Sequence, residues 1–214
     1  MTKTTSAVTT FSSYLTSLPL VAILRGIQNH ECMAIADALY QAGFRCIEVP
    51  LGSPNAFRSI EMLAASLPGD CLVGAGTVLG SGQVQSVADA GGRLIVMPHN
   101  DAAVIAAAKQ TDMFCVPGVA TISEAFAALA QGADALKLFP SESVPPSVLK
   151  AWRTVLPDGA ICLPVGGVAP QGMQEYFLAG ANGFGLGAGL YKPGMTARQV
   201  AEKATAFVAA LEER

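Results

Sequence analysis

Residues 41–51 read QAGFRCIEVPL and combine three signals that recur along the chain. Gly43 follows a helical pattern, an apolar run begins at Cys46, and one acidic residue, Glu48, interrupts that run. Glycine is favoured just after a helix because it adopts left-handed backbone geometry without the clash that a Cβ causes. A short, continuous apolar run is typical of a strand buried on both faces. The stretch therefore predicts a helix, a tight turn and a buried strand, in that order.

The same order repeats throughout the 214 residues. Gly91, Gly132 and Gly180 each stand between a helical pattern and the next apolar run. Helix starts are marked by Ser53-Pro54 and by capping boxes that begin at Thr121 and Thr196. The eight apolar runs are LPLVAIL (18–24), CIEVPL (46–51), CLVGAG (71–76), LIVMP (94–98), MFCVPG (113–118), ALKLFP (135–140), ICLPVGG (161–167) and GFGLG (183–187).

Alternating strands and helices predict a parallel sheet with helices outside it, and eight such units are the number that closes a barrel. We therefore predict an α/β protein in which residues 1–214 form a single (β/α)8 TIM barrel domain. An extra N-terminal helix is expected over residues 1–17. An open, doubly wound sheet is the alternative. No Pro/Gly/Ser-rich linker separates two halves, so the sequence indicates no domain boundary.

The composition narrows the class of function. The chain is 51% hydrophobic and 14% charged, which favours a well-filled core over disorder. A net charge of −3 without a basic cluster argues against nucleic acid or anionic lipid as a partner. The apolar runs are too short to cross a membrane, and the N-terminus lacks a secretory signal pattern, so we predict a soluble, cytoplasmic protein. The five cysteines are widely spaced, which favours buried apolar roles over a disulfide framework or a zinc site.

Charged residues mark three of the predicted strands. Arg25 follows the first run, Glu48 lies within the second, and Lys137 lies within ALKLFP. Side chains alternate between the faces of a strand, so if Leu136 and Leu138 face the helices, Lys137 points to the interior. The same argument turns Glu48 inward. A lysine and a glutamate would then share one interior.

Two interpretations of that pair stay open at this point. Burial of either charge alone is costly, so the two residues could form a structural ion pair. Burial would also depress the lysine pKa and raise the glutamate pKa, which yields an uncharged amine and a carboxyl group that exchanges protons near neutral pH. Those are the states that Schiff-base catalysis needs.

Glycine clusters indicate a second feature. Gly166-Gly167 ends the seventh run and GLGAG begins at Gly185 in the eighth, where barrels commonly bind phosphate through backbone N–H groups. Thr77 and Pro98 also follow strand ends. The two histidines are far apart and no carboxylates cluster at strand ends, so no metal site and no cofactor are predicted.

Taken in order, these motifs resemble those of the 2-keto-3-deoxy-6-phosphogluconate aldolases and their 6-phosphogalactonate relatives. The resemblance extends over nearly the whole chain and rests on AILRG (22–26), IEVPL, VGAGTV, PG (117–118), ALKLFP, PVGGV and GLGAGLY (185–191). It implies a metal-free, trimeric class I aldolase barrel. Such an enzyme cleaves a phosphorylated keto-deoxy sugar acid to pyruvate and D-glyceraldehyde 3-phosphate.

The resemblance also implies a role for each site residue. Lys137 would form the imine and Glu48 would move protons. Arg25 and Thr77 would bind the substrate carboxylate, while the remaining residues would line the pocket or bind the phosphate. These are Pro98, Phe139, Val165, Gly166, Gly167, Gly187 and Ala188.

Three positions bear on the substrate. Val165 stands before the glycine pair where the gluconate enzymes carry Thr, which favours 2-dehydro-3-deoxy-6-phosphogalactonate over the gluconate epimer or 4-hydroxy-2-oxoglutarate. Gly52 replaces an Asn of the galactonate enzymes, and Ala188 replaces a serine of the phosphate loop. A phosphosugar isomerase or epimerase with Glu48 as base is the alternative of another class, and a catalytically silent metabolite-binding barrel is a third.

Overall fold

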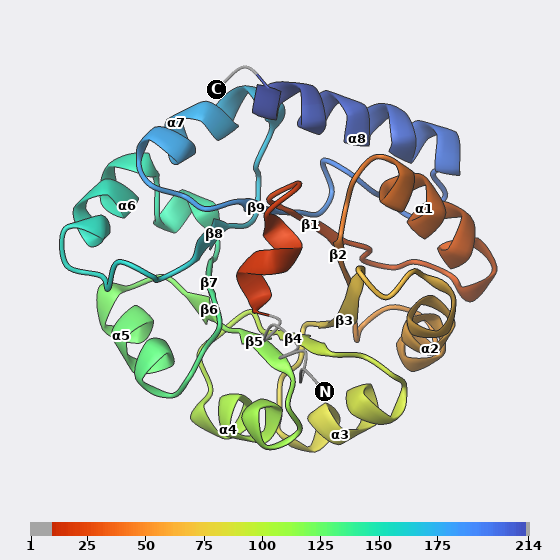
Figure 1. Ribbon diagram of the computed structural model, residues 1–214, viewed down its shortest axis with the longest axis horizontal. Helices are drawn as coiled ribbons and strands as arrows, with labels where there is room; N and C mark the ends of the chain where they lie inside the picture. The colour runs from red at the N-terminus through yellow and green to blue at the C-terminus, as the bar shows by residue number, and fades with distance from the viewer. Residues whose placement is uncertain (1–9, 213–214) are drawn as a thin grey trace, which may run out of the picture.

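A computed structural model describes residues 10–212 and shows strands in a ring with helices around its outside (Figure 1). The strands are β1 (Leu20–Ile23), β2 (Cys46–Pro50), β3 (Leu72–Gly76), β4 (Leu94–Val96), β5 (Phe114–Val116), β6 (Gly118–Val119), β7 (Leu136–Leu138), β8 (Cys162–Pro164) and β9 (Phe184–Leu186). The α-helices are α1 (Asn29–Gln41), α2 (Ala56–Ser66), α3 (Gly82–Asp89), α4 (Ala102–Gln110), α5 (Ile122–Ala130), α6 (Pro146–Arg153), α7 (Met173–Leu178) and α8 (Ala197–Glu212). Short 3-10 helices are η1 (Phe11–Leu15), η2 (Ser141–Ser143) and η3 (Pro170–Gly172).

The strands do not form one closed eight-stranded sheet, so the predicted (β/α)8 barrel is wrong. They form a six-stranded parallel sheet in the order β5-β4-β3-β2-β1-β9 and a separate three-stranded parallel sheet in the order β6-β7-β8. The alternative of an open doubly wound sheet is not observed either, because the α-helices lie on the outer side of the ring (Figure 1).

The two junctions between the sheets have local causes. At the first, Pro117 separates β5 from β6 within a single apolar run, and proline supplies no N–H for a ladder. At the second, β8 ends at Pro164, and one isolated bridge joins Val165 to Gly185. Single hydrogen bonds, such as Asp134 N–H to the Cys115 carbonyl at 2.9 Å, span the junctions without extending either ladder.

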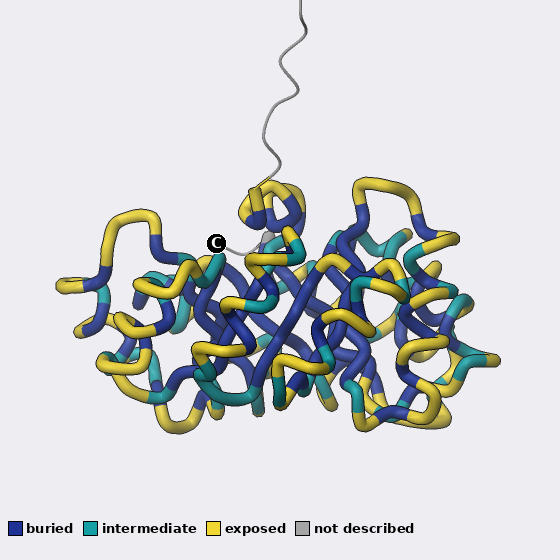
Figure 2. The backbone as a smooth tube through the Cα atoms, turned by 90° about the horizontal axis from the view of Figure 1, so that it is seen from below, coloured by how far each residue is buried: buried dark blue, intermediate teal, exposed yellow. Residues whose placement is uncertain are grey.

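The chain packs in two apolar layers. Leu136, Leu138 and Ile47 belong to the larger cluster between strands and outer helices, and Val21 and Leu163 belong to the smaller cluster inside the ring. Figure 2 shows buried strands in the middle of the molecule and exposed segments at the periphery. All five cysteines are buried, as expected for small apolar side chains. Among residues 10–212, no helix has both the length and the apolar character to cross a membrane.

The N-terminal segment covers one end of the ring. The predicted helix over residues 1–17 is observed only as η1, because residues 1–9 lie outside the described part of the chain. The Phe11 ring lies 5.9 Å from that of Phe114, the first residue of β5. Since parallel strands share one direction, η1 closes the amino end of the ring and the carboxyl end stays open for a site.

Two expected helix starts differ in outcome. The capping box of Thr121 and Glu124 forms at the start of α5. Ser53 does not cap α2, which begins at Ala56 after Asn55. Its hydroxyl instead accepts a hydrogen bond from the Gly26 N–H at 2.9 Å and so ties the turn after β1 to the loop after β2.

Candidate active site

Glu48 on β2 and Lys137 on β7 both point into the ring. They are 1% and 4% exposed and line one cavity whose other walls are apolar side chains and Gly185. Leu136 and Leu138 lie on the opposite face, among the outer cluster. The alternation of side chains along β7 therefore produces the shared interior that the sequence predicted.

The two groups do not contact one another as an ion pair. None of the ion pairs formed by residues 10–212 includes Glu48 with Lys137. Glu48 Oε2 is buried and accepts no hydrogen bond. A structural role would require the pairing that offsets burial of both charges, so the geometry does not support the structural ion pair.

Burial dominates the electrostatics of both groups. It raises the pKa of the Glu48 carboxyl from 4.5 to about 7, against the opposing charges of Lys137 and Arg25. Burial also lowers the pKa of the Lys137 amine below its ordinary value of 10.5, and the Arg25 charge lowers it further, while the Glu48 charge opposes the shift. The pair thus has a carboxyl that titrates near neutral pH and an amine that loses its proton more easily than an exposed lysine.

Gly76, which sequence reasoning did not single out as a site residue, makes room for the carboxyl. A Cβ at this position would lie 1.8 Å from Glu48 Oε2 and 2.2 Å from Cδ. Gly76 pairs with Pro50 in the β2–β3 ladder, so its backbone is held beside the glutamate. The only sequence signal was a glycine at a strand end, which turns also use.

A second cavity of about 370 Å³ opens at the carboxyl end of the strands. Lys137 lines this cavity as well as the inner one, as do Ile23, Val165 and Gly185, so these four residues form the boundary between the two cavities. Its Nζ lies 4.6 Å from the centroid of the Phe139 ring, on the same face of the strand. The predicted site residues that line this cavity are Arg25, Lys137, Phe139, Val165, Gly166, Gly167, Gly187 and Ala188.

Two predicted residues lie outside the cavity walls. Thr77 follows β3 with a φ of 54°, and its hydroxyl accepts a hydrogen bond from Arg25 Nη2 at 3.3 Å. Pro98 does not line the cavity, and its backbone instead packs against Gly118, where a Cβ would lie 2.4 Å from the Pro98 carbonyl carbon. Thr77 therefore contacts the site through its hydrogen bond with Arg25, whereas Pro98 lies outside the cavity.

The glycine pair adopts a conformation that favours glycine. Gly166 and Gly167 have φ values of 101° and 60°. The Ser141 hydroxyl donates a hydrogen bond to the Gly166 carbonyl, and the Tyr176 hydroxyl donates to the Ser141 carbonyl at 2.9 Å. These two contacts, which the motifs did not predict, fix the turn that faces the second cavity.

The loop after β9 is held by hydrogen bonds within itself and to helix α1. The Tyr191 N–H donates to the Gly187 carbonyl at 3.0 Å, and its hydroxyl donates to Glu31 Oε1 at 2.7 Å. Glu31 lies in the first turn of α1 and also accepts a hydrogen bond from the Gln28 N–H. Gly187 has open space where a Cβ would stand, so the backbone of this loop can approach a ligand closely.

The site residues include no cluster of metal ligands. Within residues 10–212, no three His, Cys, Asp or Glu side chains are close enough together to bind a metal ion. The two cavities bring together a buried amine, a buried carboxyl, a guanidinium and two glycine turns at the mouth. These groups suit a small substrate that has a ketone and anionic ends.

Comparison with known proteins agrees with the motifs. The profile of the family described as KDPG and KHG aldolase matches residues 11–204. A Rhizobium meliloti protein named "Probable 2-dehydro-3-deoxy-6-phosphogalactonate aldolase" is 47% identical over an alignment that covers 91% of this chain and 92% of that protein. The Escherichia coli 2-dehydro-3-deoxy-6-phosphogalactonate aldolase is 43% identical over an alignment that covers 92% of this chain and 97% of that protein.

A solved structure described as "Native KDPGal structure" superposes with a TM-score of 0.90 at 43% identity, covering 92% of this chain and 96% of that chain. The family resemblance predicted from the ordered motifs is thus confirmed over most of the sequence. The chain belongs to the KDPG and KHG aldolase family.

Proposed function

We propose that this chain is a class I aldolase that cleaves 2-dehydro-3-deoxy-6-phosphogalactonate to pyruvate and D-glyceraldehyde 3-phosphate through an imine on Lys137. The observation that carries the proposal is the position of Lys137, which lines both the cavity shared with Glu48 and the cavity at the mouth. The names of the two relatives support the same substrate.

The reaction begins at the lysine amine. Uncharged Lys137 Nζ attacks the C2 ketone of the substrate, and the resulting carbinolamine loses water to give an iminium ion. Glu48 supplies a proton to the departing hydroxyl and, as a carboxylate, then removes the proton of the C4 hydroxyl. A carboxyl whose pKa lies at about 7 performs both transfers near neutral pH.

Cleavage follows because the iminium accepts electrons. The C3–C4 bond breaks, its electron pair moves into the iminium to form an enamine, and C4 leaves as the aldehyde of D-glyceraldehyde 3-phosphate. Glu48 returns its proton to C3, and water hydrolyses the new imine to release pyruvate and free Lys137. No metal or organic cofactor takes part in these steps.

The two ends of the substrate would lie along the second cavity. The Arg25 guanidinium, which donates a hydrogen bond to the Thr77 hydroxyl, would bind the C1 carboxylate. The turns at Gly166-Gly167 and Gly187-Ala188 line the same cavity and would bind the phosphate with backbone N–H groups. Ala188 contributes no hydroxyl, so the phosphate would depend on main-chain donors at that position.

Val165 supports the galactonate epimer. Its side chain lines the cavity with Lys137, and Gly185 packs so closely that a Cβ there would lie 2.6 Å from Val165 Cγ2. A valine offers no hydrogen bond to the C4 hydroxyl, whereas the hydroxyl of a threonine at this position would offer one. Loss of such a bond changes epimer preference by about 1 kcal/mol or more.

Borohydride trapping tests the mechanism. Reduction in the presence of pyruvate should attach one pyruvate-derived group to Lys137, located by mass spectrometry of the peptides. Lys137→Met should abolish both the adduct and turnover, whereas the matched control Lys192→Ala, which removes an exposed lysine, should keep both. An adduct absent from the unmodified enzyme would refute the proposal and favour an isomerase or epimerase with Glu48 as base.

Comparison of the epimers tests the substrate. The kcat/KM for the galactonate compound should exceed that for the gluconate compound, and Val165→Thr should narrow the difference. A tenfold or greater preference for the gluconate compound would contradict the role given to Val165. The homotrimer implied by the family and the cytoplasmic location predicted from the sequence stay predictions. Light scattering of the purified protein measures the first.

A further inference from the structure

Phe11 stands between two cavities of different character. The inner cavity contains Glu48 and Lys137 among apolar walls. The outer cavity, of about 580 Å³, lies at the amino ends of the strands and is lined mainly by polar and charged side chains together with the rings of η1. Within residues 10–212, Phe11 is the one side chain that lines both.

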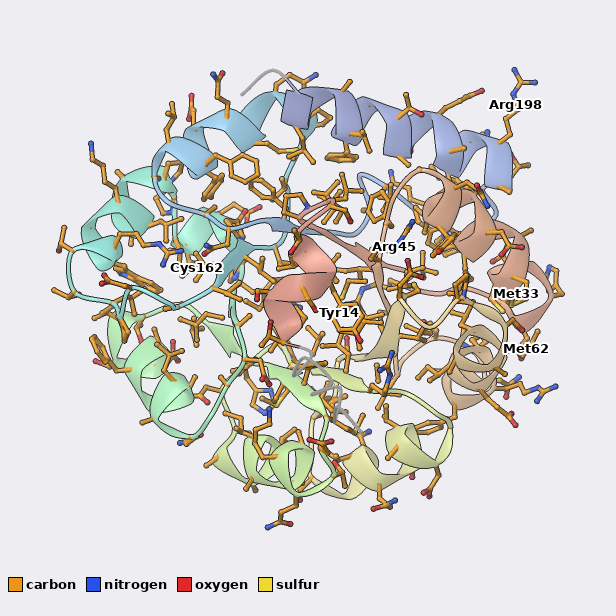
Figure 3. The ribbon with its side chains drawn as sticks, in the orientation of Figure 1. Tyr14, Met33, Arg45, Met62, Cys162 and Arg198 are labelled. Carbon is orange, nitrogen blue, oxygen red and sulfur yellow. The ribbon has the colours of Figure 1, made fainter. Side chains whose placement is uncertain are left out.

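The Phe11 ring is held in this position by its neighbours. It is 3% exposed, and its centroid lies 5.9 Å from that of Phe114. Tyr14, one turn later on η1, packs edge-on against the same Phe114 ring at 5.9 Å. Figure 3 shows Tyr14 on η1 at the centre of the ring of strands. The two aromatic residues of η1 therefore fix the short helix against β5.

The two aromatic residues differ in which cavities they line. Tyr14 lines only the outer cavity, whereas Phe11 also reaches the inner one. The charged residues of the outer cavity are Arg93, Lys109, Asp112 and Asp134, and the last of these pairs with Lys109. Such a lining admits water, while the inner walls do not favour it.

We propose that Phe11 is a positioning residue of the reaction, because its ring separates the solvent of the outer cavity from Lys137 and Glu48 and so preserves the apolar surroundings of the pair. This inference rests on the proposed imine chemistry. It assigns a part in catalysis to a residue of the N-terminal segment that lies at the opposite end of the strands from the substrate.

Few charged groups surround Glu48 and Lys137, so the access of solvent has a large influence on the pKa values of the two residues. Glu48 and Lys137 face one another and Arg25, and the Cys46 thiol lies near Glu48 on the same strand. Phe11 and the remaining walls of the inner cavity contribute no charge. Burial is the largest cause of both pKa shifts. The Phe11 ring lines the cavity in which the two groups are buried.

The test is the pH profile of kcat/KM for cleavage. Phe11→Ala should join the two cavities and hydrate the pair, which raises the pKa of Lys137 and lowers that of Glu48. Because attack requires the uncharged amine, the acid limb of the profile should move to higher pH by about one unit. Activity at neutral pH should fall by about tenfold, and recover as the pH is raised.

Two matched variants separate this effect from loosening of η1. Phe11→Leu keeps an apolar side chain at the boundary and should retain most of the original profile. Tyr14→Ala weakens the same contact with Phe114 but leaves the inner cavity closed, so its Tm should fall without a shift of the profile. If Phe11→Ala does not fold, Phe11→Val provides the smaller deletion and should give a smaller shift of the same sign.

The outcomes that overturn the inference are distinct. A folded Phe11→Ala enzyme whose profile superimposes on that of the unmodified enzyme would refute it, as would an equal shift in Tyr14→Ala. Borohydride trapping of pyruvate on Lys137 in the unmodified enzyme tests the proposed function independently. A trapped adduct together with an unmoved Phe11→Ala profile would refute the role of Phe11 alone.

Discussion

Substitution of Gly76 by alanine should separate catalytic geometry from stability. The added Cβ would lie 1.8 Å from Glu48 Oε2 and 2.4 Å from Oε1, whereas ordinary contacts begin at 3.4 Å. The difference between 3.4 and 1.8 Å requires a displacement of about 1.6 Å. The strand cannot supply it freely, because the Gly76 carbonyl accepts a hydrogen bond from the Leu51 N–H at 2.8 Å. The carboxyl end of the flexible Glu48 side chain must move instead.

Such a displacement should affect catalysis far more than folding. A misplacement of about 1 Å costs roughly 10²-fold in rate, so kcat of Gly76→Ala should fall by about that factor. Overpacking of a movable side chain should cost about 1 kcal/mol, equivalent to roughly 2–4 °C in Tm. Steady-state cleavage assays and thermal unfolding measure the two quantities.

A glycine without neighbours provides the control. A Cβ at Gly80 would meet nothing within 4 Å, so Gly80→Ala should leave kcat and Tm close to those of the unmodified enzyme. If Gly76→Ala retains full kcat, the carboxyl of Glu48 does not need its observed position and the proton-transfer role is wrong. A collapse of Tm with kcat preserved in the folded fraction would refute the argument equally.

Three further substitutions test Glu48 itself and two other contacts of the site. Because burial raises the pKa of Glu48 from 4.5 to about 7, its contribution to stability is present below pH 4.5 and lost as pH rises through about 7. The free energy of unfolding should therefore fall by about 3 kcal/mol across this pH window, and Glu48→Gln should remove that fall, as measured by urea unfolding at pH values on either side of it. The same substitution should slow turnover by roughly 10²- to 10⁴-fold. Thr77→Val keeps the side-chain shape but removes the oxygen that accepts from Arg25, so KM should rise roughly fivefold with kcat little changed; an unchanged KM would show that this bond does not orient Arg25. Gly167→Ala would place a Cβ 2.7 Å from Glu142 Oε1 at a φ of 60°, and should raise KM for the phosphorylated substrate by about tenfold while borohydride trapping of pyruvate continues. Equal loss of trapping would mean that this turn supports the imine site and not the phosphate.

The local pattern predicted much of the site. Each of the eight apolar runs contains at least one strand, and the alternation of side chains correctly turned Lys137 and Glu48 inward. Period-two alternation is a property of any extended chain, so it is readable from neighbouring residues. Arg25 and the glycine turns were found because strand ends of parallel sheets meet at one edge.

Other parts depended on distant neighbours. The sequence does not say that Ser53 binds the Gly26 N–H in place of capping a helix, that Pro98 packs against Gly118, or that Gly76 faces Glu48. These contacts join different strands and loops, and each is fixed by sheet register. A motif specifies its own residues but not the partner that register brings opposite them.

The amino-acid sequence by itself determined the succession of helices and parallel strands, the inward lysine and glutamate, and the family, because hydrophobic periodicity and motif order are local properties. Only the tertiary structure decided that the strands divide into two sheets, since this depends on whether backbone groups on either side of Pro117 and Val165 find partners across the junctions. It also decided that Phe11 lines the cavity that Lys137 and Glu48 share, because burial is a property of the assembled ring and of no single segment.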